Sequence, residues 1–112
     1  MASLTLTGGK GSFTWTISGL YWPFNTIEYE MAGICTGSFD NGTTDMPSGI
    51  ISHIMAESPK ETDSKSVSGS ISYKSGTYSF YGFTKTPNGQ YWLAGSDSVY
   101  VEEEEEEVSE EE

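Results

Sequence analysis

The feature that most constrains the fold of this chain is an alternation of large apolar side chains with hydroxyl-bearing ones, repeating every two residues. It is clearest over residues 12–18, where Phe13, Trp15 and Ile17 alternate with serines and threonines. Successive side chains of a β-strand point to opposite faces, whereas a helix repeats every 3.6 residues. The segment is therefore expected to be a half-buried strand, with three apolar groups on one face and hydroxyl groups on the other.

Similar segments recur along the chain, with turn residues between them. Gly8-Gly9-Lys10-Gly11 supplies the glycines that a chain reversal needs, and Ser75-Gly76 marks another turn. Seven or eight short strands rich in aromatic and β-branched residues predict an antiparallel sandwich or barrel. The further expected strands are 4–7, 27–31 with an extension toward residue 34, 67–73, 78–83, 91–93 and 99–101. The side chains expected to hold the core are Trp15, Tyr29, Ile71, Phe80, Tyr91 and Leu93.

One segment fits two patterns. Between Pro47 and Ser58, four apolar residues at positions 50, 51, 54 and 55 have the spacing of one helical face, yet they also suit a strand. The β-branched isoleucines favour the strand. The polar composition of Ser58 to Ser66 predicts a loop.

The acidity of the chain is concentrated at its end. The formal net charge is −12, but nine of the seventeen acidic residues lie in the run that starts at Glu102, so the rest carries −3. Like charges with almost no apolar content bury nothing. We therefore expect a β-sandwich domain over residues 1–101 and a disordered acidic tail over 102–112. The tail is read as a solvating linker or the end of a piece of a longer chain, with an electrostatic arm for a basic partner as the alternative.

Composition also excludes several classes of partner and site. Five lysines and no arginine are too few for a nucleic-acid reader, which must replace phosphate counterions. No apolar run approaches the roughly 18 residues of a membrane helix, and Met1-Ala2-Ser3 does not open a signal peptide. The protein is thus expected to stay inside the cell or to be an internal piece of an exported one. The single cysteine, Cys35, permits no internal disulfide.

Three segments together resemble fibronectin type III and related immunoglobulin-like modules. They are the Trp-bearing segment at 12–18, the following segment Ile27-Glu28-Tyr29-Glu30-Met31, and the late run Tyr78–Phe83 with Tyr91-Trp92-Leu93. The resemblance covers most of the folded part and implies an all-β, two-sheet antiparallel sandwich of 7–8 strands. In that family an early Trp packs in the core, and Trp15 would take its place here.

The resemblance also implies a corner between the two sheets late in the chain. There Gly82-Phe83 would take the place of the family's Gly-Leu step. Tyr91 would take the place of the family's core Tyr on the penultimate strand. A second interpretation treats residues 84–89 as a hairpin loop, because Pro87-Asn88-Gly89 is turn chemistry. The two differ in topology, since only the hairpin pairs Phe80–Phe83 with Tyr91–Ala94 in one sheet.

Catalytic candidates are weak. Cys35 and the only histidine, His53, could supply two members of a nucleophilic triad, but no motif surrounds them. Glu28 and Glu30 have the separation of a glycosidase pair, yet they also form the polar phase of an amphipathic strand in a domain too small for a deep sugar cleft. We expect no enzyme activity and no cofactor.

The segment Asp40-Asn41-Gly42-Thr43-Thr44-Asp45 groups oxygen-bearing side chains, as calcium sites do. The spacing of a calcium loop fails, because the twelfth position is Ile51 and no glutamate closes the site. An Asn-Gly turn without metal is expected. Asn41-Gly42-Thr43 also matches the short acceptor pattern for N-glycosylation, which matters only in a eukaryotic secretory route.

Aromatic side chains carry the strongest binding signal. Three Trp, seven Tyr and five Phe exceed what one small core can hold. Tyr21, Trp22 and Phe24 surround Pro23 in a predicted loop, and Trp92 adds a fourth contact candidate. Exposed aromatics of this kind stack on sugars or anchor proteins, although those at 22 and 24 could instead cap the sandwich. The spacing of Tyr78 to Phe83 also requires one sheet face to carry aromatics.

These observations favour a non-catalytic structural or adhesive module of a larger exported, cell-surface or virion protein, as the family resemblance implies. The alternative is a small carbohydrate-binding module that uses exposed aromatics. A protein or polysaccharide partner suits either hypothesis.

Overall fold

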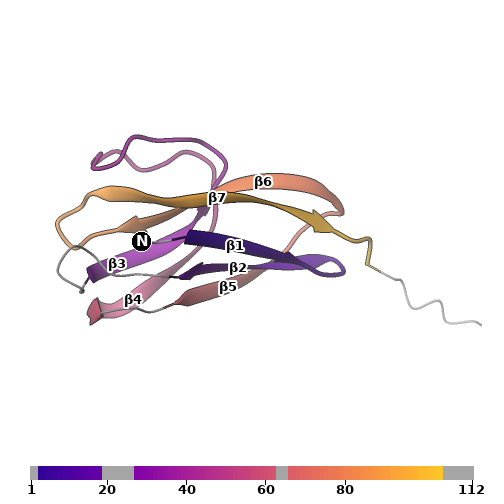
Figure 1. Ribbon diagram of the computed structural model, residues 1–112, viewed down its shortest axis with the longest axis horizontal. Coiled ribbons are helices and arrows are strands. Elements are labelled where there is room, and N and C mark those ends of the chain that lie inside the picture. The colour runs from indigo at the N-terminus through magenta and orange to yellow at the C-terminus, as the bar shows by residue number, and fades with distance from the viewer. Residues whose placement is uncertain (1–2, 19–26, 63–65, 105–112) are drawn as a thin grey trace, which may run out of the picture.

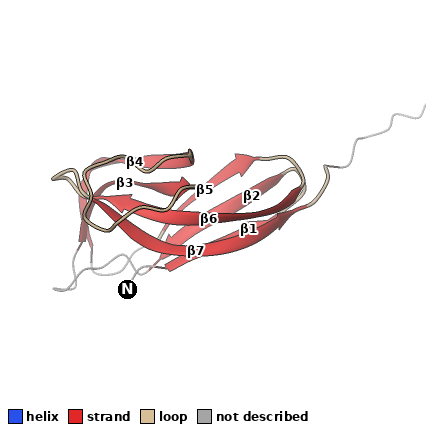
Figure 2. Ribbon diagram, turned by 90° about the horizontal axis from the view of Figure 1, so that it is seen from above, coloured by secondary structure: helices blue, strands red, loops and turns tan. Residues whose placement is uncertain are grey.

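The computed structural model describes residues 3–18, 27–62 and 66–104, apart from the side chains of 27–29 and 56–62. This part contains seven β-strands and no helix, hence none that could span a membrane. They form two antiparallel sheets packed face to face, with strand orders β1-β2-β5 and β4-β3-β6-β7 (Figures 1 and 2). The all-β two-sheet sandwich is therefore confirmed. The strands are β1 Ser3–Gly8, β2 Ser12–Ser18, β3 Ile27–Cys35, β4 Ile50–Thr62, β5 Val67–Ser72, β6 Gly76–Lys85 and β7 Tyr91–Val101.

The three-stranded sheet follows the predicted alternation. Phe13, Trp15 and Ile17 of β2 are all buried, and the residues between them face outward. The reversal from β1 to β2 occurs at the predicted glycines, where the Gly9 amide donates to the Ser12 carbonyl at 2.9 Å. Gly11 has a φ of 72°, a left-handed conformation that costs glycine little.

The ambiguous segment after Pro47 is a strand, as the isoleucines indicated. β4 runs from Ile50 to Thr62 and pairs with β3. The loop predicted over Ser58 to Ser66 is therefore wrong for residues 58–62, and residues 63–65 lie outside the described part. Polar composition misled here because β4 is the edge of its sheet, where charged residues and a proline are tolerated.

The two segments predicted at 91–93 and 99–101 are one strand, β7, interrupted by a β-bulge. The register slips by one residue opposite Gly82 and Phe83, and Gly95 at the bulge has a φ of 112°. A bulge exchanges the two faces of a strand. Val99 and Val101 thus point into the core, whereas Leu93, which shares their parity, points outward and is 41% exposed. Its predicted core position is wrong for this reason.

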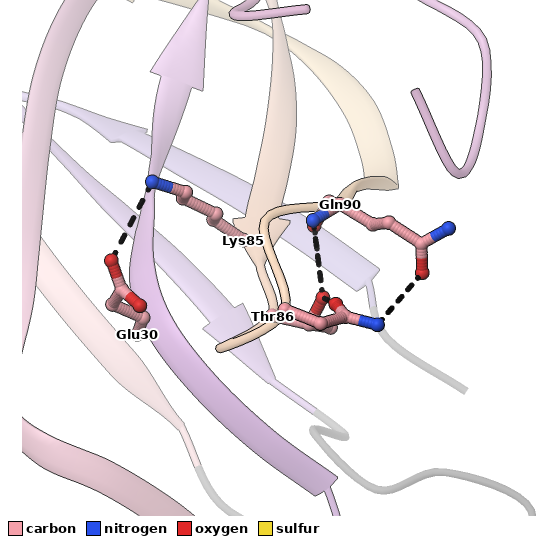
Figure 3. A network of polar contacts seen from close by, with 5 residues as sticks. Glu30, Lys85, Thr86 and Gln90 are labelled. Carbon is pink, nitrogen blue, oxygen red and sulfur yellow. Dashed lines mark hydrogen bonds and ion pairs between the residues drawn. The ribbon is translucent and has the colours of Figure 1, made fainter. Parts of the chain in front are cut away.

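β6 and β7 form a hairpin within one sheet. Phe83 pairs with Leu93 and Lys85 with Tyr91 across a turn in which the Thr86 amide donates to the Gln90 carbonyl at 2.9 Å. Figure 3 shows that the Thr86 hydroxyl is also hydrogen-bonded to the Gln90 backbone in this turn. The hairpin interpretation is confirmed for the pairing of the two strands, although residues 84 and 85, which it placed in the loop, belong to β6. The corner assigned to Gly82-Phe83 and Tyr91 is wrong, because Gly82 and Phe83 lie within a strand and Tyr91 begins the last one.

The main core lies between the sheets and centres on Trp15. Its indole N–H donates to the Ser52 hydroxyl of the opposite sheet at 2.8 Å, and Phe13 and Phe80 stack with ring centroids 5.3 Å apart. Among the other predicted core residues Ile71 is half-buried against this cluster, and Tyr91 is buried elsewhere. The Tyr29 side chain lies outside the described part. The buried members of the core are Leu4, Leu6, Phe13, Trp15, Ile17, Ala32, Ile34, Val67, Phe80, Ala94, Val99 and Val101.

The first and last strands close one side of the sandwich. The Leu6 amide of β1 donates to Asp97 Oδ2 of β7 at 2.9 Å. Beyond the strand ends, Glu102 pairs in parallel with Lys10 and exchanges backbone hydrogen bonds with Gly9 and Gly11. β1 and β7 thus run side by side in the same direction (Figure 1). Residues 105–112 of the predicted tail lie outside the described part.

Candidate functional site

A second apolar cluster lies on the outer face of the four-stranded sheet. Its buried members are Met31, Cys35, Phe83 and Tyr91, and Phe39, Ile50 and Tyr81 pack against them. This is the face on which the sequence requires aromatic side chains. Phe83 is fully buried and Tyr91 only 3% exposed, so these two rings offer no stacking surface for a ligand.

The outer cluster is buried because the connection from β3 to β4, the covering loop of residues 36–49, folds over it. Backbone bonds from Thr36 to Gly49 and from Gly37 to Ser48 close the loop at its base. Figure 1 draws it at the top, above β6 and β7. A compact loop with its two ends tied together in this way is an Ω-type loop.

The far side of the covering loop is fixed to the edge of β7. Tyr91 exchanges two backbone hydrogen bonds with the loop, at 2.7 Å with Gly42 and 2.8 Å with Thr43. Asn41 Oδ1 accepts the Leu93 amide at 2.6 Å. The polar segment considered for calcium is thus a turn that caps a sheet edge. Within the described residues no group of three or more His, Cys, Asp or Glu side chains could hold a metal.

Beside the covering loop, the same outer face has an open hollow of about 360 Å³. The Ser79 and Ser98 hydroxyls are hydrogen-bonded to each other at 2.8 Å in its lining. The carboxylate of Asp97 is already engaged, because one oxygen accepts the Leu6 amide and the other the Ser98 amide. The hollow therefore offers one half-buried aromatic ring and several hydroxyl groups. Its lining residues are Thr36, Ser79, Tyr81, Ser96, Asp97 and Ser98.

Of the four predicted contact aromatics, only Trp92 belongs to the described residues; Tyr21, Trp22 and Phe24 lie outside them. Trp92 is half-buried. Its ring lies against the covering loop, since a Cβ on Gly42 would be 3.6 Å from Trp92 Cη2. At least part of the indole is thus committed to a contact within the domain.

Cys35 and His53 do not form a reactive pair in the described structure. Cys35 is fully buried and its thiol donates to the Gly37 carbonyl at 3.3 Å, while His53 is exposed on β4. Burial raises the pKa of the Cys35 thiol to about 11, with a smaller opposing effect from the Gly37 hydrogen bond. A nucleophilic cysteine needs the reverse, a lowered pKa and access to solvent.

Glu30 belongs to an ion pair at the rim of the outer cluster. Its carboxylate lies 3.5 Å from Lys85 Nζ (Figure 3). Lys85 Nζ in turn lies 5.7 Å from the centre of the Tyr91 ring. The side chain of Glu28 lies outside the described part, so the two glutamates cannot be compared as a catalytic pair. Glu30 itself has the role of a partly exposed structural charge.

The sequence interpretation missed an extended hydroxyl face on the three-stranded sheet. Every outward position of β1, β2 and β5 is a serine or a threonine, so this face carries neither charge nor large apolar groups. Cross-strand hydroxyl pairs join Thr14 to Ser70 and Thr16 to Ser68, both at 3.1 Å. The signal was present as alternating serines over 68–72, but only the strand order β1-β2-β5 assembles three strands into one face.

The chain was compared with known proteins at three levels. No family model matches it, and no curated protein and no solved structure matches it significantly.

Proposed function

We propose that this chain is a non-catalytic structural or adhesive module of a larger exported, cell-surface or virion assembly. The observation that carries the proposal is the path of the chain through the domain. Ser3 lies beside Gly95, and Glu102 ends the same side of the sandwich beside Gly9. Seven residues of strand from Gly95 to Glu102 separate these points by roughly 23 Å. The chain enters at one end of the sandwich and leaves at the other, as a spacer between neighbouring modules requires.

An immunoglobulin-like, fibronectin type III-like identity is part of the proposal, and three features support it. Lettered A, B, C, C′, E, F and G in chain order, the strands give sheets A-B-E and C′-C-F-G. Trp15 on the second strand is a buried core residue. The Tyr78 hydroxyl, just after the crossing between sheets, donates to the carbonyls of Lys74 and Ser75 at 2.8 and 3.1 Å. Immunoglobulin-like domains have such a tyrosine corner between strands E and F.

Single-molecule stretching tests the structural role. With the chain held at its two ends, the links between β1 and β7 are loaded along the strands, so we expect one all-or-none unfolding event. Releasing about 100 residues of extended chain should lengthen the molecule by roughly 300 Å. Extension without a resisting event, or in several small steps, would contradict a load-bearing spacer.

The hollow beside Tyr81 favours carbohydrate binding as a second candidate function. A half-buried tyrosine ring next to several hydroxyl groups suits a neutral sugar, because the nearby Asp97 carboxylate is already hydrogen-bonded. Intrinsic fluorescence titrated with a panel of neutral polysaccharides tests it. Saturable binding lost in Tyr81→Ala but kept in Tyr100→Ala, an exposed tyrosine of β7 outside the hollow, would favour this function. No response to the panel would remove it.

A further inference from the structure

Three of the four sheet edges carry features that prevent pairing with another strand. The β1 edge lies against β7, where the Leu6 amide is bonded to Asp97. The β7 edge is capped by the covering loop, which takes both backbone groups of Tyr91. The β4 edge has an irregular register and the charged, proline-containing sequence of residues 57–61. Bulges, prolines, charges and covering loops are the usual protections of exposed edges.

The fourth edge, β5, has none of these protections among the residues that the structure describes. Its sequence Val67-Ser68-Gly69-Ser70-Ile71-Ser72 contains no charge and no proline, and its register with β2 is unbroken over all six residues. Within the described residues, no strand pairs with its other side. Figure 1 draws β5 on the far side of β2 from β1.

The hydrogen-bond pattern determines which groups β5 presents at this edge. In an antiparallel pair, hydrogen-bonded and non-hydrogen-bonded residue pairs alternate. The Tyr73 amide donates to the Gly11 carbonyl at 3.0 Å, and the register places these two residues opposite each other. Alternate residues of β5, namely 67, 69 and 71, therefore bond to β2. The backbone N–H and C=O groups of Ser68, Ser70 and Ser72 point away from β2.

The other side of β2 gives the same assignment independently. The Gly9 amide donates to the Ser12 carbonyl, so the even-numbered residues of β2 bond to β1. Phe13 and Trp15 are then left to bond to β5. The short hydroxyl contacts of Thr14 with Ser70 and Thr16 with Ser68 agree, because side chains lie closest in non-hydrogen-bonded pairs.

We propose that β5 is a self-association edge, at which two copies of this chain pair antiparallel through Ser68, Ser70 and Ser72. In this dimer the two-fold axis passes between Ser70 of one copy and the partner's Ser70. Ser68 then faces the partner's Ser72, and three hydrogen-bonded pairs form. The edge is self-complementary because it is neutral, free of proline and built of small outward side chains. Pairing joins the two hydroxyl faces into one six-stranded face.

Charge accounts for the antiparallel arrangement. The chain carries −12, and the Glu104 carboxylate lies near Gly11, next to the Tyr73 end of β5. In an antiparallel pair these acidic ends are roughly 20 Å apart, beyond the Debye length of about 8 Å at physiological salt. A parallel pair would place them side by side. Because six residues form a small interface, we expect a weak dimer with a dissociation constant of about 10 μM to 1 mM.

Analytical ultracentrifugation of the full chain across this concentration range tests the proposal. The decisive variant is Ser70→Pro, which removes an amide that points to the free edge and not one bonded to β2. We expect it to weaken dimerisation at least about tenfold, whereas the control Ser70→Ala keeps the amide and the dimer. Two results would overturn the proposal. One is a monomer at every concentration, which would leave the edge to a strand of another protein. The other is a dimer of Ser70→Pro that is as strong as that of the unaltered chain.

Hydrogen exchange of the unaltered chain gives a second test that does not depend on a variant folding. In dilute solution the amides of Ser68, Ser70 and Ser72 should exchange faster than those of Gly69 and Ile71. At the highest concentration the three serine amides should become protected. Protection that is independent of concentration, or the opposite alternation, would contradict the assigned edge.

Discussion

Replacing Gly69 by alanine is a sharp test of the core, because local preference and packing predict opposite results. Glycine within a strand is less stable than alanine by roughly 0.5–1 kcal/mol, so the backbone alone predicts a gain. A Cβ at Gly69, however, would lie 2.7 Å from Cε2, Cζ2 and Nε1 of Trp15. The indole is fully buried and hydrogen-bonded to Ser52, which leaves it no room to move.

Overpacking of this kind costs about 1–3 kcal/mol, which exceeds the backbone gain. We expect Gly69→Ala to lower the free energy of unfolding by about 1–2 kcal/mol in urea, with an unchanged dependence on denaturant, and the melting temperature by roughly 5–15 °C. Gly9→Ala is the matched control, because a Cβ there would be 3.4 Å from the nearest atom, an ordinary contact.

Combining Gly69→Ala with Trp15→Phe identifies the cause of the loss of stability. A phenyl ring lacks the indole atoms that the new Cβ would meet, so Gly69→Ala should cost almost nothing in that background. A stabilising Gly69→Ala, or the same cost with phenylalanine at position 15, would refute the packing of Trp15 against β5.

Three further predictions test separate parts of the structure. Cys35 should resist thiol reagents until the protein unfolds. Because its pKa is raised from 9.0 to about 11, the free energy of unfolding should fall as the pH rises above 9. Cys35→Ala should remove this pH dependence. Asp97→Ala should cost about 1–3 kcal/mol in urea denaturation by leaving the Leu6 amide without its acceptor, whereas Asp97→Asn should cost less. Asn41→Ala should release the covering loop from the Leu93 amide, seen as faster hydrogen exchange over residues 36–49 with a loss of global stability of only about 1 kcal/mol.

The sequence predicted the strands well where one face is buried and the other solvated. Phe13, Trp15 and Ile17 are buried as their alternation requires, and the strand interpretation of the segment after Pro47 is confirmed. These features depend on local spacing and side-chain shape, which are evident in the sequence itself.

The features that the sequence did not predict depend on contacts between distant segments. Leu93 has the parity of a core residue, but one extra residue before Gly95 turns it outward. Tyr91 and Phe83 lie on the outer face and are buried only because the covering loop folds back over them. The hydroxyl face likewise needed the strand order, because β5 lies far from β1 and β2 in the sequence.

The proposed spacer role depends most on the chain crossing the domain from one end to the other. Spin labels at Ser3→Cys and Glu102→Cys, in a Cys35→Ala background, report the distance between those ends by pulsed electron resonance. We expect a single narrow distribution centred at roughly 25 Å, set by seven residues of β-strand. A broad distribution, or one centred well below about 15 Å, would place the two ends together and contradict the spacer.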